Sequence, residues 1–277
     1  MTLQSAVSIP AAFAVTATVV LVALRARALS LSGASAALAA GTLAMSRSLG
    51  WGAFLILWFG LAALLSRVGR ARKAERTREI VAKGGRRDAW QVLANGAVFA
   101  GGAALLATDA VPTRAIDLVS VAAAAALVAA GADTWATELG TLAGGRPWSL
   151  RERRRVAVGS SGAITLVGTV ASLAGAFLLS ALAGALAVIP QRAIPLVAAA
   201  GFAGAAADTL VGAWWQERRW CPSCTAVTEQ RVHRCGTTTV QRGGVRALTN
   251  DGVNFACTVC AAAVAASLWF AGLANGW

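Results

Sequence analysis

The sequence predicts an all-α protein, a polytopic bundle of about eight transmembrane helices with both termini outside and a Cys/His-containing loop in the cytoplasm. Three observations support this prediction. Of the 277 residues, 57% are hydrophobic and only 13% are charged, which is far from the composition of a soluble domain. Apolar stretches of membrane-spanning length recur along the chain, and basic residues gather in alternate loops between them. Ala and Gly supply much of the apolar mass, and such small residues suit close helix packing in lipid.

The apolar stretches together make residues 1–277 a single integral membrane domain. About 20 apolar residues are enough to cross the hydrocarbon core of a bilayer. Stretches of roughly this length lie at 6–24, 29–46, 50–66, 89–108, 116–143, 159–189, 194–215 and 253–274. The 159–189 stretch is too long for one simple span.

The loops between these stretches set the orientation. Loops 25–28, 67–88, 144–156 and 216–250 hold 22 of the 25 Lys and Arg residues. The positive-inside rule places these loops in the cytoplasm, so the protein is expected in the cell membrane with several passes. The formal charge of +13 then matches the membrane surface and anionic ligands, and nucleic acid is not an expected partner.

The stretch "GADTWATELG" at 131–140 places acids at the end of a membrane helix. At 100° per residue, Asp133, Thr134, Thr137, Glu138 and Thr141 fall within an arc of about 140°. Ionisable residues inside a membrane are costly and are usually functional. A network of hydrogen bonds between helices is the alternative, but such a network does not need two negative charges. The polar arc therefore predicts a cavity inside the bundle.

A second polar face begins the helix expected after loop 67–88. In "GGRRDAWQVLANG", Arg87, Gln91 and Asn95 are spaced by four residues and share one helix face. These side chains could line a binding site, or the Gln and Asn could simply join neighbouring helices.

Polar residues also occur in the last two helices. In "TNDGVN", Asn250 and Asn254 are one turn apart, with Asp251 beside them, at the cytoplasmic start of the last helix. The string "AADT" at 206–209 repeats the "GADT" of 131–134, so Asp208 is a second intramembrane acid.

The string "GSSG" at 159–162 follows the basic run "RERRR" at 151–155, with three apolar residues between them. We expect it to open a helix. Small residues such as Ser160 and Ser161 at a helix N-terminus leave backbone N–H groups free to bind an anion. The motif is weak in itself, because Gly–Ser pairs are common in loops.

The loop 216–250 contains the sequence "WCPSCTAVTEQRVHRC". Cys221, Cys224, His233 and Cys235 are four nitrogen and sulfur ligands of the kind that bind zinc tetrahedrally. A cytoplasmic loop disfavours a stable disulfide. We expect a structural zinc ion here, and a reduced, metal-free loop is the alternative.

These strings together resemble the domain of unknown function 92 family, the integral membrane proteins that include transmembrane protein 19 and the plant phytyl-phosphate kinase. The resemblance rests on "GGRRDAWQVLANG", "GADTWATELG", "GSSGAITLVGTVAS", "CPSC…VHRCGT" and "TNDGVN", which run from residue 83 to 254. It implies a prenyl-phosphate kinase, which transfers a phosphoryl group from a nucleoside triphosphate, CTP being one candidate, to a prenyl (phytyl-like) monophosphate.

Phosphoryl transfer needs positioning and charge neutralisation, and the polar residues can be assigned on that basis. Asp133, Glu138 and Asp251 are the catalytic candidates, with Asp133 and Glu138 expected to bind Mg²⁺, which prefers oxygen ligands. The candidates for binding substrate and nucleotide are Arg86, Arg87, Gln91, Asn95, Thr134, Ser160, Ser161, Asp208, Asn250 and Asn254. A transporter or flippase for an anionic lipid is the alternative, because repeated acids inside the membrane also occur in carriers.

Overall fold

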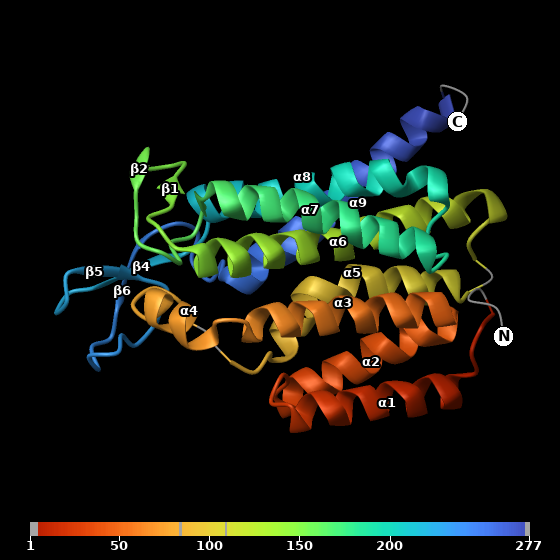
Figure 1. Cartoon of the computed structure of the whole chain (residues 1–277), viewed down its shortest axis with the longest axis horizontal. Coiled ribbons are helices and arrows are strands. Elements are labelled where there is room, and N and C mark those ends of the chain that lie inside the picture. The colour runs from red at the N-terminus through yellow and green to blue at the C-terminus, as the bar shows by residue number, and fades with distance from the viewer. Residues whose placement is uncertain (1–4, 83–84, 109, 275–277) are drawn as a thin grey trace.

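The computed structural model describes residues 5–82, 85–108 and 110–274. In these residues the chain forms nine α-helices, which run side by side along the long axis of the molecule except for the short α4 (Figure 1). The helices are α1 (Ile9–Arg25), α2 (Leu31–Arg47), α3 (Leu49–Arg67), α4 (Arg70–Thr77), α5 (Ala89–Leu106), α6 (Thr113–Ala143), α7 (Leu166–Ala185), α8 (Ile194–Trp214) and α9 (Asn250–Ala274). A short 3₁₀ turn, Gln191–Ala193, leads directly into α8.

Each of the eight expected apolar stretches contains one of these helices. Six helical segments are long and apolar enough to cross a membrane: α3, α5, α6, α7, the segment Gln191–Trp214 and α9. The helices α1 and α2 have 17 residues each, which is at the lower limit for a span. The prediction of a polytopic helical membrane protein is therefore confirmed.

Local sequence explains where several helices begin. Ser48 separates α2 from α3: its extended backbone ends one helix, and its hydroxyl accepts a hydrogen bond from the backbone N–H of Trp51, at 3.3 Å. Asp88 begins α5 through a reciprocal capping box with Gln91, which satisfies two backbone donors that the helix leaves free. Thr165 caps α7 in the same way as Ser48 caps α3.

The helix α6 lies at the centre of the bundle. Every residue from Ala123 to Ala132 is buried, and α6 contacts α3, α5, α7, α8 and α9. Small residues make this close packing possible. At Gly204 of α8, an added Cβ would lie 2.7 Å from the Cβ atoms of both Ala129 and Ala261. A buried central helix can place side chains inside the bundle, away from lipid.

Two small three-stranded antiparallel sheets lie at one end of the bundle, which we call the sheet end (Figure 1). One sheet has the order β2-β1-β3, from Arg154–Arg155, Trp148–Ser149 and Ala163–Ile164, and the other has the order β5-β4-β6, from Ala226–Thr228, Arg218–Cys221 and Val240–Gly243. The helix α4 lies at this end too, whereas the first and last described residues lie at the opposite end. Three of the four basic loops thus meet at the sheet end.

Two details differ from the sequence prediction. The "GSSG" string does not open a helix: residues 159–162 form a turn that leads into β3, and α7 begins at Leu166. The reason is that Thr165, which the sequence analysis did not single out, provides the cap, and Gly159 and Gly162 both have positive φ angles that end regular structure. The loop 67–88 contains the short helix α4, which is too polar to have been recognised as part of the bundle.

Candidate functional site

A cavity of about 1190 Å³ opens within the bundle near the sheet end. Most of the polar residues that the sequence analysis selected line it. They are Arg87, Gln91, Asn95, Asp133, Thr134, Glu138, Ser160, Ser161, Asp208, Asn250, Asp251 and Asn254. Arg86 is exposed and does not line the cavity. These residues come from four helices, α5, α6, α8 and α9, and from two loops, and they all face a single space.

Asp133 of α6 and Asp208 of α8 are the two acids deepest in the helices. They are close enough for their charges to repel each other, so the two "ADT" strings contribute to one site. The buried Oδ2 atom of Asp208 has no hydrogen-bond partner among the described residues. Asp133 likewise has no hydrogen bond or ion pair with another described residue. Two acids on one cavity wall without a cationic partner can offer their oxygen atoms to a metal ion.

Glu138, the other acid of α6, has a cationic partner. The ammonium of Lys73, on α4, donates to Glu138 Oε2 and to the backbone carbonyl of Leu65, the latter at 2.7 Å. The hydroxyl of Ser66 donates to Glu138 Oε1 at 2.5 Å. Lys73 is 7% exposed, so this ion pair is largely shielded from water. The sequence analysis missed Lys73, because a lysine in a basic loop carries no sign of its distant partner.

Several other candidates take part in hydrogen bonds within their own helices. The side chain of Gln91 accepts from the backbone N–H of Asp88 at 3.1 Å, and the Asn95 amide donates to the carbonyl of Gln91 at 2.7 Å. The hydroxyl of Thr134 donates to the carbonyl of Ala130 at 2.8 Å. These bonds fix the orientation of the three side chains while they remain at the cavity wall.

A chain of side chains joins the "GSSG" turn to the loop 216–250. The hydroxyl of Ser161 donates to Gln216 Oε1 at 2.6 Å, and Gln216 Nε2 donates to Glu229 Oε1 at 2.7 Å. Burial raises the pKa of Glu229 to about 7, although the hydrogen bond from Gln216 opposes this shift. Glu229 and Gln216 also line the cavity. The sequence analysis missed both, because each stands in a polar loop.

Basic side chains line the same cavity. They are Arg27, Arg67, Arg70, Lys73, Arg87, Arg219 and Arg231. The guanidinium of Arg87 lies over the ring of Phe59, 5.4 Å from its centroid. Arg219 forms an ion pair with Glu217. The cavity thus combines acids with a set of cations that come from different parts of the chain.

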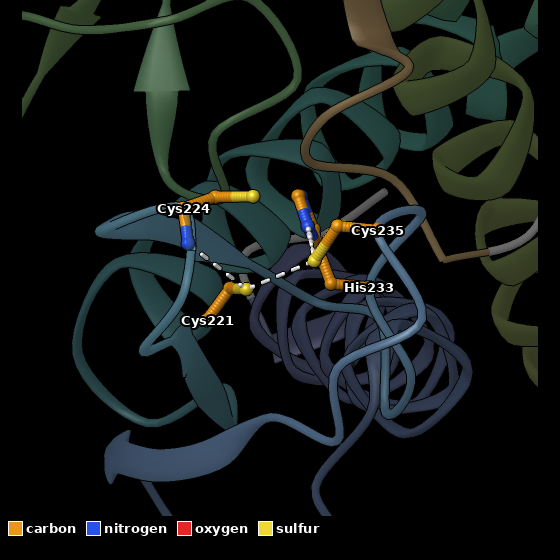
Figure 2. A group of neighbouring side chains, drawn as sticks. All are labelled: Cys221, Cys224, His233 and Cys235. Carbon is orange, nitrogen blue, oxygen red and sulfur yellow. Dashed lines mark hydrogen bonds between the residues drawn. The ribbon is translucent and has the colours of Figure 1, made fainter.

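The predicted cysteine cluster is assembled in the structure. The ligand atoms of Cys221, Cys224, His233 and Cys235 all lie within 4.8 Å of one another, and the four side chains converge (Figure 2). The Cys221 and Cys235 Sγ atoms are 3.6 Å apart, and His233 Nδ1 is 3.3 Å from Cys235 Sγ. The cysteines are free thiols. The Thr237 hydroxyl, and secondarily His233, lowers the pKa of the Cys235 thiol to about 5, and the thiolate is the form that binds metals.

Comparison with known proteins places the chain in a family. A family model described as integral membrane protein DUF92 matches residues 14–262. The chain belongs to this family. It is therefore a multi-pass integral membrane protein, as its composition and helices indicate.

Two curated relatives support the assignment. The chain is 28% identical to Protein PGR of Arabidopsis thaliana over 234 residues, which cover 77% of this chain and 80% of the relative. It is 34% identical to the uncharacterized membrane protein MJ0933 of Methanocaldococcus jannaschii over 167 residues, which cover 59% of this chain and 64% of the relative. No solved structure matches the chain significantly.

Proposed function

We propose that this protein is a membrane-embedded kinase that transfers a phosphoryl group from a nucleoside triphosphate to a prenyl monophosphate and produces the diphosphate. The observation that carries this proposal is the cavity, in which unpaired acids and a set of cations face one space between membrane helices. Phosphoryl transfer depends on such positioning and on neutralising charge. From the basic loops we expect the reaction at the cytoplasmic face.

The walls of the cavity suit an amphiphilic acceptor. The residues that α1, α2 and α3 contribute to the lining are mostly apolar, for example Val20, Ala37 and Phe59. A prenyl tail can bury its hydrocarbon surface against such walls, at a gain of about 25 cal/mol per Å² of apolar surface. The polar end of the same cavity would then receive the phosphate.

Unpartnered polar atoms on the cavity wall also favour a bound ligand. Among the described residues, six buried side-chain polar atoms have no hydrogen-bond partner. Four of these belong to residues that line the cavity: Thr16, Trp58, Ser172 and Asp208. Buried polar groups are normally satisfied, so a ligand that offers donors and acceptors would complete them.

The acids fit the magnesium ion that such a reaction requires. Asp133 and Asp208 offer oxygen ligands, which Mg²⁺ prefers, and neither is neutralised by a neighbouring cation. Asp251 lies on the same wall. Glu138 already forms an ion pair with Lys73, so we assign the metal to Asp133 and Asp208. The role of Glu138 is to hold Lys73 at the cavity. When bound, the metal would neutralise phosphate charge.

The chemistry does not demand a strong general base. The second pKa of a phosphate monoester is about 6, so the acceptor is already largely ionised at neutral pH. The basic residues of the lining, such as Arg70, Arg87 and Arg231, are placed to bind the phosphates of donor and acceptor. A prenyl alcohol as acceptor would require a base, and Glu229 or Asp133 would have to accept the proton.

Purified protein tests the proposal directly. Protein in detergent is incubated with Mg²⁺, labelled nucleoside triphosphates and prenyl monophosphates of several lengths, and the products are separated by chromatography. We expect the label to move to a prenyl diphosphate, and omission of Mg²⁺ to abolish the transfer. If no nucleotide labels any prenyl phosphate, while protein in liposomes moves the lipid between leaflets, the kinase proposal is wrong and the carrier alternative replaces it.

We also propose that the Cys/His cluster binds zinc. Tetrahedral zinc with Zn–S distances of about 2.3 Å places two thiolates about 3.8 Å apart, close to the 3.6 Å between Cys221 and Cys235. Three cysteines and one histidine are a common ligand set of structural zinc sites. Elemental analysis should find one zinc per chain in the wild type and less than half of that in Cys224→Ser.

A further inference from the structure

The Cys/His cluster belongs to a small module that is attached to the segment after α4. This module is the loop 216–250, with strands β4, β5 and β6. Beyond β5, the backbone N–H of Glu229 donates to the carbonyl of Ile80 at 2.9 Å, and the Thr228 hydroxyl lies 3.3 Å from the same oxygen. The Gln230 amide donates to the carbonyls of Arg78 and Val81 at 3.0 and 3.1 Å. The module therefore binds the backbone of residues 78–81.

The imidazole of His233 adds a side-chain link between the cluster and this segment. His233 is buried, and its Nδ1 atom faces Cys235. Its Nε2 atom lies 3.3 Å from Glu79 Oε2, without the alignment of a hydrogen bond, and has no other hydrogen-bond partner among the described residues. The other oxygen of Glu79 pairs with Arg234 at 3.0 Å.

This arrangement matches the surroundings of a metal-bound histidine. A histidine that binds a metal through one ring nitrogen usually donates the other N–H to a carboxylate or carbonyl, which fixes the tautomer and makes the ligand more basic. Here Nδ1 faces the sulfur of Cys235, and Nε2 lies 3.3 Å from the carboxylate of Glu79. A small rotation of either side chain would align the bond.

We infer that Glu79 is the outer-sphere partner of His233, and that the metal-bound module thereby fastens residues 78–81, and α4 with them, over the cavity. This attachment would also affect the cavity. Lys73 on α4 reaches Glu138 at the cavity wall, while Glu229 from the module lines the same cavity. Metal binding would then hold two cavity residues from different parts of the chain in place. The inference rests on the zinc proposal and not on the kinase reaction.

The first test measures metal affinity. Zinc is titrated out of purified protein with a chromogenic chelator of known affinity, for the wild type, Glu79→Ala and Glu75→Ala. Loss of an outer-sphere carboxylate typically lowers metal affinity 10- to 100-fold, and we expect this for Glu79→Ala. Glu75 is an exposed acid of α4 that pairs with Arg78, so Glu75→Ala should bind zinc like the wild type. Equal affinity in all three proteins would overturn the role of Glu79.

The second test measures whether the metal fastens the segment. Hydrogen exchange is followed in peptides that cover residues 73–82, with and without zinc, and in Cys224→Ser and Cys260→Ser. We expect at least a 10-fold faster exchange at 78–81 in stripped wild type and in Cys224→Ser. Cys260 lies outside the cluster, so Cys260→Ser should keep its protection. Unchanged exchange after metal removal, or protein purified with no zinc, would contradict the inference. Neither test measures turnover, so both can be interpreted even if the kinase assay fails.

Discussion

At the scale of single residues, the surroundings of each acid suggest what it can do. Glu138 and Glu217 each have a cationic partner, Lys73 and Arg219. Asp133 and Asp208 have no cationic partner among the described residues, and Glu229 also repels the charge of Asp208. Removing a charge from water without a partner is expensive, so a bound cation would stabilise the ionised form of both acids. This is the physical basis for assigning the metal to the aspartates.

The aspartate pair yields the most direct prediction. Asp133→Asn and Asp208→Asn should keep the fold, because the amide is nearly isosteric and easier to bury than a charge. Each should lower the rate of phosphoryl transfer by at least about 10²-fold, by comparison with the loss of single electrostatic contacts in other enzymes. The measurement is turnover with prenyl phosphate and Mg²⁺, with a melting curve for each variant.

Asp117→Asn is the matched control. Asp117 is on the same helix, α6, at the end far from the cavity, where it lies 3.4 Å from Arg192. Its substitution should leave turnover unchanged. If Asp133→Asn melts normally and turns over like the wild type, Asp133 is not a metal ligand.

Glu229 predicts a pH dependence of stability. Burial raises its pKa from the ordinary 4.5 to about 7, so the folded protein holds this proton more tightly than the unfolded chain does. The contribution of Glu229 to stability is thus greatest below pH 4.5 and falls as the pH rises to about 7. The loss is at most about 3 kcal/mol, from about 1.4 kcal/mol per pKa unit.

Thermal unfolding without nucleotide, between pH 5 and pH 8, measures this effect. Glu229→Gln cannot titrate, so its melting temperature should fall less across this range than that of the wild type. Glu75→Gln, which alters an exposed acid, should follow the wild-type curve. Parallel curves for wild type and Glu229→Gln would show that Glu229 is ionised across the whole range.

At the scale of secondary-structure elements, α4 illustrates how a polar helix becomes part of a membrane protein. Isolated helices of eight residues are unstable in water, and α4 has no apolar face to bury. It is held by its basic side chains: Lys73 pairs with Glu138, and Arg76 donates to the carbonyls of Thr141 and Leu142 at 2.6 and 2.8 Å. These carbonyls belong to the last turn of α6, whose negative dipole end attracts cations.

This attachment of α4 can be tested with a double-mutant cycle. Lys73→Met leaves Glu138 partly buried without its cation, which should lower the free energy of unfolding by roughly 3 kcal/mol. Glu138→Gln combined with Lys73→Met should recover part of this loss, because no unpaired charge remains. Thermal melting of the two single variants and the double variant gives the coupling energy. Additive losses would mean that the ion pair does not hold α4 in place.

At the scale of the whole molecule, the bundle has a clear polarity from end to end. Three basic loops and both sheets lie at the sheet end, and the first and last described residues lie at the other (Figure 1). Arg114 and Arg192 stand near the helix starts at that far end. This asymmetry is what the positive-inside rule requires of a cytoplasmic sheet end.

Cysteine labelling tests this orientation. A membrane-impermeant maleimide, added to sealed cells, should label Arg114→Cys and should miss Arg153→Cys, which lies in loop 144–156. Labelling of Arg153→Cys in sealed cells would place the cavity on the outer side of the membrane.

The sequence by itself determined the class of the protein, the eight helices and the polar faces. The lipid bilayer explains why. A spanning segment must satisfy its backbone hydrogen bonds internally and expose apolar side chains, so the helices can be predicted from local composition. The acids of "GADTWATELG", Asp133 and Glu138, could be recognised for the same reason, because acids within an apolar stretch are unusual in any membrane helix.

Only the tertiary structure decided which of these polar groups share a site. The approach of Asp208 to Asp133, the pairing of Lys73 with Glu138 and the burial of Glu229 join residues far apart in the chain. Such pairings depend on how α4, α6 and α8 pack, and no local pattern encodes them. The turn at 159–162 shows the same limit: Gly162 has a positive φ, and an added Cβ there would lie 2.3 Å from the Cα atom of Ala213 of α8, so a contact with a distant helix also requires glycine. Packing between distant segments, and not local propensity, therefore set the composition of the cavity.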